Sequence, residues 1–310
     1  MMSRILFVLF SCAVFGCSAG SDAPATNSDP GFRNVFALSS AGQLYRSKDT
    51  GLTWQLVAFP TVAPIKSLAS QDNDLYAATD SGVFVTYDDG DHWSNNFAGF
   101  FGTTTCVLSN GHSIYEGTHD GLYRSSDGGH YWEALEPGIM IANLAPFRNR
   151  IFASILNDSG LLVSPEDNGP NWKYLKTASI FKSAPTELIS SNDYFYVGWS
   201  GWGSYFRTSD YGNNWQQVGR LDLTAGPWRF YEALSGGSQR VTSIDDGLHL
   251  QQIAQAMETI GGIDFLDRDF AVLHTFYGDS LLRTIDRGVT WRLMSVPWKP
   301  DRAFLTILTK

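Results

Sequence analysis

The stretch Ser47-Lys48-Asp49-Thr50-Gly51-Leu52-Thr53-Trp54 decides the fold, because its pattern returns along the chain. The pattern is Ser/Thr-x-Asp-x-Gly-x-Thr-Trp, and seven full or degenerate copies begin at residues 47, 86, 125, 165, 208, 243 and 284. The copy at 165 has Pro165 in place of Ser, and the copy at 243 has Leu250 in place of Trp. A period of about 40 residues is typical of propellers and solenoids.

Each copy has the chemistry of a hairpin turn. Asp and Ser/Thr side chains accept hydrogen bonds from backbone N–H groups in such turns. Gly permits a positive φ, and the Trp ring packs against a neighbouring sheet. Each copy offers one recurrent carboxylate, whereas calcium binds six or more oxygens. We therefore interpret the recurring aspartates as structural: Asp49, Asp88, Asp127, Asp167, Asp210, Asp245 and Asp286.

These copies resemble the Asp-box, or BNR, repeat of sialidase-like propellers over residues 32–310. The resemblance implies an all-β β-propeller of four-stranded antiparallel blades, with each box in the turn between the third and fourth strands. The seven copies predict seven blades. It leaves the function open, since the family spreads the motif over enzymes, receptors and assembly factors.

The first blade lacks one strand of its own. Residues 35–38, 43–47 and 54–59 supply three strands, and the C-terminal strand at residues 303–308 is expected to complete the blade and close the ring. Blade six, over residues 225–257, is the weakest prediction, because residues 248–260 suit a helix as well as a strand.

The N-terminus indicates export. Residues 1–16 have a positive start and a short apolar run, which is typical of a signal peptide. They end in Val14-Phe15-Gly16-Cys17, which resembles a bacterial lipobox with Cys17 as the lipidated residue. Residues 17–31 then form a polar tether. Ser18 resembles an outer-membrane sorting pattern, so we expect a lipid-anchored envelope protein, with the leaflet left open. The alternative is an ordinary signal peptide with a chance cysteine.

Composition and motifs argue against several classes of function. The net charge of −9 disfavours a nucleic-acid partner. The histidines show no metal-ligand spacing, and no Ser-His-Asp or nucleophile-elbow arrangement is evident. We therefore expect no cofactor, no metal and no assured catalytic residue. Cys106, the one cysteine of the predicted domain, is expected to be a small buried residue.

Ligands of propellers usually bind the face opposite these turns, where aromatic loops are expected. An interaction surface there is one interpretation; rings tucked between blades are the other. The candidate aromatic residues are Phe100, Phe101, Phe181, Trp199, Trp202 and Trp228.

A polar set is expected near the channel mouth: Lys66, Glu187, Arg229 and Asp264. These residues either hold a ligand or pair with one another. Glu116 falls where related strands carry Ala or Val, so its carboxylate needs a partner, from His119 or a neighbouring blade. We expect Glu116 to have a structural role.

The favoured function is a non-catalytic, envelope-anchored scaffold that recognises a protein partner. In size, blade number and lipid anchor the chain resembles the lipidated propellers of the photosystem II assembly factor family, although that family's basic patch is not evident. The alternative is glycan chemistry. Sialidases have six blades and a clustered arginine triad, whereas the arginines here recur before the boxes. Xyloglucanase-like glycosidases pair two propellers. A hydrolase would use Glu187 and Asp264 about 5–10 Å apart, and a lectin would use Trp199 and Trp202.

Overall fold

The structure is a computed structural model that describes residues 34–39, 41–71, 73–95, 103–177, 185, 187–190, 194–198, 204–219, 229–234, 238–243, 251–252, 260–265, 271–275, 281–285, 290–294, 296 and 304–309. These ranges form 27 strands arranged in antiparallel sheets. The predicted all-β class is therefore confirmed.

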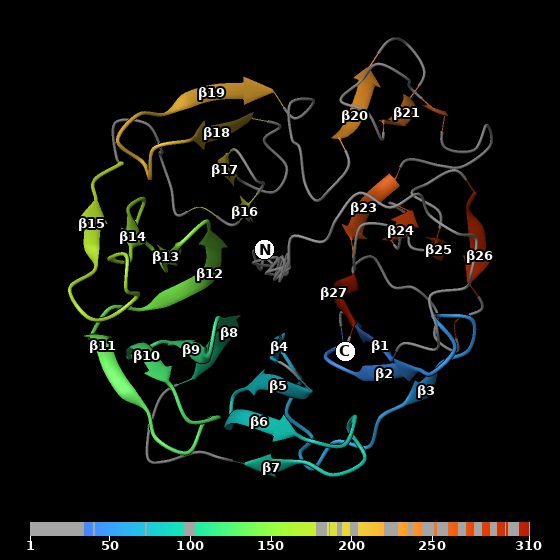
Figure 1. Ribbon diagram of the computed structural model, residues 1–310, viewed down its shortest axis with the longest axis horizontal. Helices are drawn as coiled ribbons and strands as arrows, with labels where there is room; N and C mark the ends of the chain where they lie inside the picture. Colours follow the sequence, from blue (N-terminus) through green and yellow to red (C-terminus); the bar gives the residue numbers. More distant parts are fainter. Residues whose placement is uncertain are drawn as a thin grey trace, which may run out of the picture.

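Most of the sheets follow one another around a common centre, with their first strands inward and their last strands at the periphery (Figure 1). The sheet formed by residues 229–234, 238–243 and 251–252 lies farther from that centre, at the upper right of the view. In hydrogen-bonded order, the sheets of the described residues are as follows: β27 (Phe304–Thr309), β1 (Val35–Ser39), β2 (Leu44–Ser47) and β3 (Gln55–Leu56); β4 (Ser67–Gln71), β5 (Asp74–Thr79), β6 (Gly82–Thr86) and β7 (Ser94–Asn95); β8 (Thr104–Asn110), β9 (Ser113–Thr118), β10 (Gly121–Ser125) and β11 (Glu133–Pro137); β12 (Ile141–Phe147), β13 (Arg150–Ile155), β14 (Leu161–Val163) and β15 (Lys173–Leu175); β16 (Glu187–Ser190), β17 (Phe195–Gly198), β18 (Ser204–Thr208) and β19 (Gln216–Gly219); β20 (Arg229–Leu234), β21 (Ser238–Ser243) and β22 (Gln251–Gln252); β23 (Ile260–Phe265), β24 (Ala271–Thr275), β25 (Leu281–Thr284) and β26 (Arg292–Met294).

The C-terminal strand joins the N-terminal sheet. β27 pairs with β1 in antiparallel register from Val35↔Thr309 to Leu38↔Thr306. The sheet of β20, β21 and β22 has three strands in the described residues. Of the segment that the sequence left open between helix and strand, Gln251 and Gln252 form β22 and the rest, apart from Ile260, lies outside the described residues.

Burial falls from the middle of each sheet to its periphery. Every residue of β1, β6 and β17 is buried, whereas both residues of β3 and of β7 are exposed. Middle strands pack between two neighbouring sheets, so their sequences are apolar on both faces. The outermost strands face solvent on their outer edge, where short strands limit unwanted pairing.

The box turns bond internally. In the first copy, Ser47 Oγ donates to Asp49 Oδ1 (2.7 Å) and accepts from Gly51 N (2.7 Å). Asp49 also accepts from Thr53 N (2.8 Å) and from Thr53 Oγ1 (2.6 Å). The copies led by Thr86, Ser125 and Thr208 repeat the hydroxyl–Asp and hydroxyl–Gly bonds. These contacts satisfy backbone donors that the turn would otherwise leave unpaired.

The box glycine has two reasons to be glycine. Gly51 has a φ of +86°, which side chains oppose. A Cβ on Gly51 would also lie 2.7 Å from Met294 Cε of the preceding sheet, and one on Gly212 would lie 2.5 Å from Leu175 Cδ1. The turn thus abuts the outer strand of the sheet before it.

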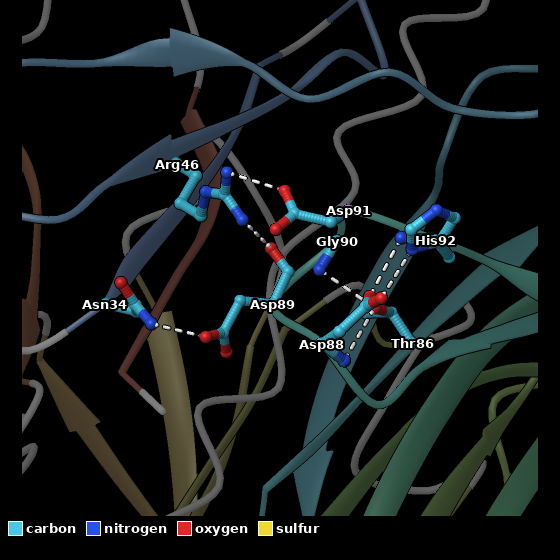
Figure 2. A network of polar contacts seen from close by, with 8 residues as sticks. All are labelled: Asn34, Arg46, Thr86, Asp88, Asp89, Gly90, Asp91 and His92. Carbon is cyan, nitrogen blue, oxygen red and sulfur yellow. Dashed lines mark hydrogen bonds and ion pairs between the residues drawn. The ribbon is translucent and has the colours of Figure 1, made fainter.

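The arginine that precedes a box contacts the box of the next sheet (Figure 2). Arg46 of β2 donates to the Asp89 backbone carbonyl (2.7 Å) and forms an ion pair with Asp91 (2.8 Å). Asn34 donates to Asp89 Oδ2 in the same turn (2.8 Å). The Arg46 guanidinium therefore joins the first sheet to the second through two of its nitrogens, Nη1 and Nη2.

Two further arginines make the same connection. Arg124 donates to the Asn168 carbonyl (3.3 Å), and Arg283 donates to the Thr50 carbonyl and hydroxyl. The accepting residue is the fourth of its box in each case. Its φ is 54° at Thr50, 63° at Asp89 and 52° at Asn168. This left-handed conformation is uncommon for residues other than glycine.

The fourth copy departs from the others. Ser164, one residue before the predicted start, donates its hydroxyl to Asn168 Oδ1 and is fully buried. Asp167 accepts from Gly169 N (3.1 Å). In this copy Ser164 supplies the hydroxyl, one residue before the Ser/Thr position of the motif, because Pro165 occupies that position and has no hydroxyl.

Replacing Arg46 with Lys tests the contact between sheets. A single ammonium cannot bond the Asp89 carbonyl and the Asp91 carboxylate with the same two-pronged geometry. We expect Arg46→Lys to lower the free energy of unfolding by about 1–2 kcal/mol in urea titrations. The exposed neighbour Lys48→Ala is the control and should change it by less than about 0.5 kcal/mol. Equal stability of Arg46→Lys and the wild type would contradict this account.

Candidate functional site

The turns of each sheet divide between two ends of the molecule. The boxes lie between third and fourth strands, and we call this end the box face. The connections from one sheet to the next, and those between second and third strands, lie at the opposite end, which we call the box-free face. The loops expected to bind ligands belong to the box-free face.

All six predicted aromatic binding residues fall outside the part of the chain that the structure describes: Phe100, Phe101, Phe181, Trp199, Trp202 and Trp228. Cys17, Asp245 and Asp286 lie outside it as well. Their roles stay predictions.

The backbone places three of the predicted polar residues on the first strands of their sheets. Glu187 and Arg229 are the first residues of β16 and β20. Asp264 is the fifth of the six residues of β23, which carries an irregularity between Ile260 and Gly262. Asp264 therefore lies closer to the box face along its own strand than Glu187 does along β16.

Lys66 connects two sheets on the box-free face. Its ammonium forms an ion pair with Asp80 and donates to the Thr104 carbonyl (3.0 Å). Asp80 follows β5 in the same sheet, and Thr104 begins β8 of the next. The Lys66 side chain is 18% exposed and the Asp80 side chain 50% exposed. Neither partner was predicted from the sequence. The pairing Ser67↔Ala78 brings Lys66 close to Asp80, but no sequence signal indicates Thr104.

Glu116 lies between the second and third sheets. It is 1% exposed and pairs in register with Val107 and Tyr123. Those two residues belong to the same buried cluster as Ala69 and Ala78 of the second sheet. Residues directly opposite one another on antiparallel strands share a face, so the Glu116 side chain points toward the second sheet.

The hydrogen-bond partner of Glu116 is Thr104 of its own sheet, not His119 or a neighbouring sheet. Thr104 Oγ1 donates to Glu116 Oε1 at 2.6 Å. Burial raises the pKa of Glu116 to about 7, against the lowering effect of the Thr104 bond. The carboxyl is therefore poised to titrate near neutral pH.

Cys106 is buried, as predicted, and burial raises the pKa of its thiol to about 12. A thiol in this state is a poor nucleophile. Within the described ranges, no group of three or more His, Cys, Asp or Glu side chains is placed to hold a metal ion. Those ranges also hold no helix with the length and apolar character needed to cross a membrane.

The described box carboxylates accept hydrogen bonds from groups of their own turns. Asp88 accepts from His92 N (2.8 Å) and contacts His92 Nδ1 (2.7 Å). These bonds hold the pKa of Asp88 at about 2. Hydrogen bonds of the same kind, led by the Tyr131 backbone N–H, lower the pKa of Asp127. The carboxylates that the sequence repeats most often therefore act within their own turns.

No family model and no curated protein matches the sequence. Solved structures do match. YCF48 bound to D1 peptide is 16% identical, with a TM-score of 0.51, and the match covers 88% of each chain. A nidogen/laminin complex is 13% identical with a TM-score of 0.52, covering 89% of this chain and 97% of that one. A protein from Lactobacillus plantarum is 15% identical with a TM-score of 0.56, covering 90% and 99%.

The fold is a β-propeller. At identities of 13–16%, these matches establish the arrangement of sheets and nothing about the ligand. In a propeller the first strands surround the centre, and the connecting turns lie on two opposite faces.

The Glu116 carboxyl gives a testable pH dependence. Its pKa is about 7 in the folded protein and 4.5 in a model carboxyl, so the folded state binds more protons between these values. The contribution of Glu116 to the free energy of unfolding is therefore fully present below pH 4.5. It is lost as pH rises through 7, which lowers the free energy of unfolding by on the order of 3 kcal/mol.

Unfolding of the wild type and of Glu116→Gln should be compared from pH 4.5 to 8.5. Gln keeps an acceptor for Thr104 but does not ionise, so the difference between the two proteins isolates Glu116. We expect the wild type to lose stability relative to Glu116→Gln as pH rises. A difference that does not vary with pH would show that the carboxyl does not titrate in this range.

Proposed function

We propose that this chain is a closed, seven-bladed propeller of the Asp-box kind that acts as a non-catalytic scaffold and binds a protein partner through its box-free face. The observation that carries the proposal is the difference between the two faces. In the box turns the carboxylates and hydroxyls bond to their own backbone, with the exposed side chains of Leu52, Tyr87 and Tyr131 beside them. The connections of the opposite face carry the exposed side chains of Val62 and Met140.

Closure is supported by three contacts between the ends of the chain. β27 pairs with β1. Trp54 and Val35 of the first sheet share a buried cluster with Leu281 and Met294 of the last. Arg283 donates to Thr50 of the first box. A ring closed in this way has no free edge beside its first sheet.

The box-free face supports a role in binding. Val62 is fully exposed in the connection between β3 and β4, and Met140 is 43% exposed in the connection between β11 and β12. The predicted aromatic residues belong to equivalent connections. Aromatic and Met side chains are enriched at protein interfaces, and Trp, Tyr and Arg dominate their energetics.

The structural neighbours are consistent with a protein partner. YCF48 was solved with a D1 peptide, and the nidogen/laminin structure is a complex of two proteins. A propeller can therefore serve this purpose without catalysis. For this chain we propose an envelope or secreted protein as the partner.

The position of Asn34 supports an orientation of the domain relative to its proposed membrane anchor. Asn34 precedes β1 at the box face and bonds Asp89 of a box turn. If Cys17 carries lipid, the tether of residues 17–31 attaches the propeller by this face. The box-free face would then lie away from the anchored end of the domain. We propose attachment to the outer membrane on this basis and on the sequence pattern at Cys17 and Ser18.

The binding face can be tested by capture of partners from detergent-solubilised envelope. We expect Val62→Asp/Met140→Asp to lose at least about tenfold of the partner captured by the wild type, because charge at an apolar contact must be desolvated. Tyr131→Asp is the matched control on the box face, where Tyr131 is 70% exposed. Loss of capture by Tyr131→Asp alone would overturn the assignment of the face.

A Trp199→Ala/Trp202→Ala/Trp228→Ala variant extends this test to the predicted aromatic loops. We expect the same loss of capture, with an unchanged unfolding transition. If no protein is captured by any version, the glycan alternative takes precedence, and polysaccharide binding and hydrolysis should be screened with the same variants.

Lipid attachment has its own test. Cys17→Ser removes the thiol that would carry the lipid, and a single-residue change leaves the propeller sequence intact. We expect this variant to move from the membrane fraction to the soluble fraction. Unchanged partition into membranes would contradict the proposed anchor.

A further inference from the structure

A chain of polar contacts leads from the box-free face to the buried Glu116. Asp80 pairs with the Lys66 ammonium, which donates to the Thr104 carbonyl, and the Thr104 hydroxyl donates to the Glu116 carboxyl. The exposed end is Asp80, and the buried end is Glu116 at 1% exposure. One residue, Thr104, therefore touches both the ammonium and the buried carboxyl.

The charged groups around Glu116 are few. From the second sheet, Lys66 precedes β4 and Asp80 follows β5, while Asp74 starts β5 at the box end and Tyr76 packs in the shared cluster. β4 and β6 contain no ionisable residue within their bounds.

The third sheet contributes the remaining ionisable groups. Tyr123 lies beside Glu116 in register, and burial, Asp120 and Glu116 together raise its pKa. Asp120 precedes β10, and His119 is exposed after β9. Cys106 of β8 stays a thiol. Among these groups, Lys66 is therefore the cation best placed to neutralise a negative charge on Glu116.

We propose that Glu116 is a proton-dependent latch between the second and third sheets, and that its ionisation draws the Lys66 ammonium from Asp80 toward the buried carboxylate. When Glu116 is protonated, it needs no cation, and Lys66 neutralises Asp80. When Glu116 is charged, a buried carboxylate without a cation is costly. The flexible Lys66 side chain compensates it and leaves Asp80 without its partner.

The latch changes the charge of the box-free face. With Lys66 turned inward, Asp80 presents an unpaired carboxylate beside the connection that carries Val62. Proton release inside the contact between sheets thus makes this face more acidic. This inference concerns the free protein and does not depend on the proposed partner.

A double-mutant cycle with Lys66→Met and Glu116→Gln tests the coupling without any ligand. The equilibrium constant for unfolding is measured for the four proteins at pH 5.5 and at pH 8.5. We expect the coupling between the two positions to be at least about tenfold larger at pH 8.5, where Glu116 is charged. Equal coupling at both pH values would overturn the proposal.

A spectroscopic readout separates the latch from a merely structural role. In carbon-13 NMR spectra of the wild type, the chemical shift of the Asp80 carboxyl carbon should change with the same midpoint as the Glu116 signal. Glu116→Gln should remove that change. Persistence of the change in Glu116→Gln, or its absence from the wild type, would show that Lys66 does not exchange partners.

Discussion

The contact between an arginine of one sheet and the box turn of the next, made by Arg46, Arg124 and Arg283, is the interaction on which the alignment of neighbouring sheets depends. Each sheet buries its two faces against its neighbours, and apolar packing of this kind has little directionality. The guanidinium supplies the direction, because it needs the carbonyl of the fourth box residue at a fixed place. The residues that supply this carbonyl, Thr50, Asp89 and Asn168, all have a left-handed φ.

This arrangement gives the two faces different roles, one in holding the fold together and one in carrying variable loops. The box face is occupied by bonds that hold turns together and sheets in line, so its repeated carboxylates serve the fold. On the opposite face Lys66 also joins two sheets, but the connections vary in sequence and length and contain no repeated box. Binding residues in propellers are therefore expected on loops that the rigid sheets position but do not constrain.

Local chemistry was predictable from the sequence, and contacts between sheets were not. The hydroxyl–Asp–Gly turn followed from Ser47, Asp49 and Gly51, because its partners lie within a few residues. The partner of Arg46 lies 43 residues away, and its acceptor is a backbone carbonyl with no sequence signature. Thr104 was missed as the partner of Glu116 for a different reason, because the sequence does not indicate the irregular register between β8 and β9 that brings them together.

Hydrogen–deuterium exchange of the protein with and without its captured partner tests the central claim most directly. Backbone amides in the connections at residues 59–66 and 138–141 should gain protection, and the box turns at 47–54 and 86–93 should exchange at unchanged rates. Protection confined to the box turns would contradict the account, because it would place the partner on the face that we assign to structure.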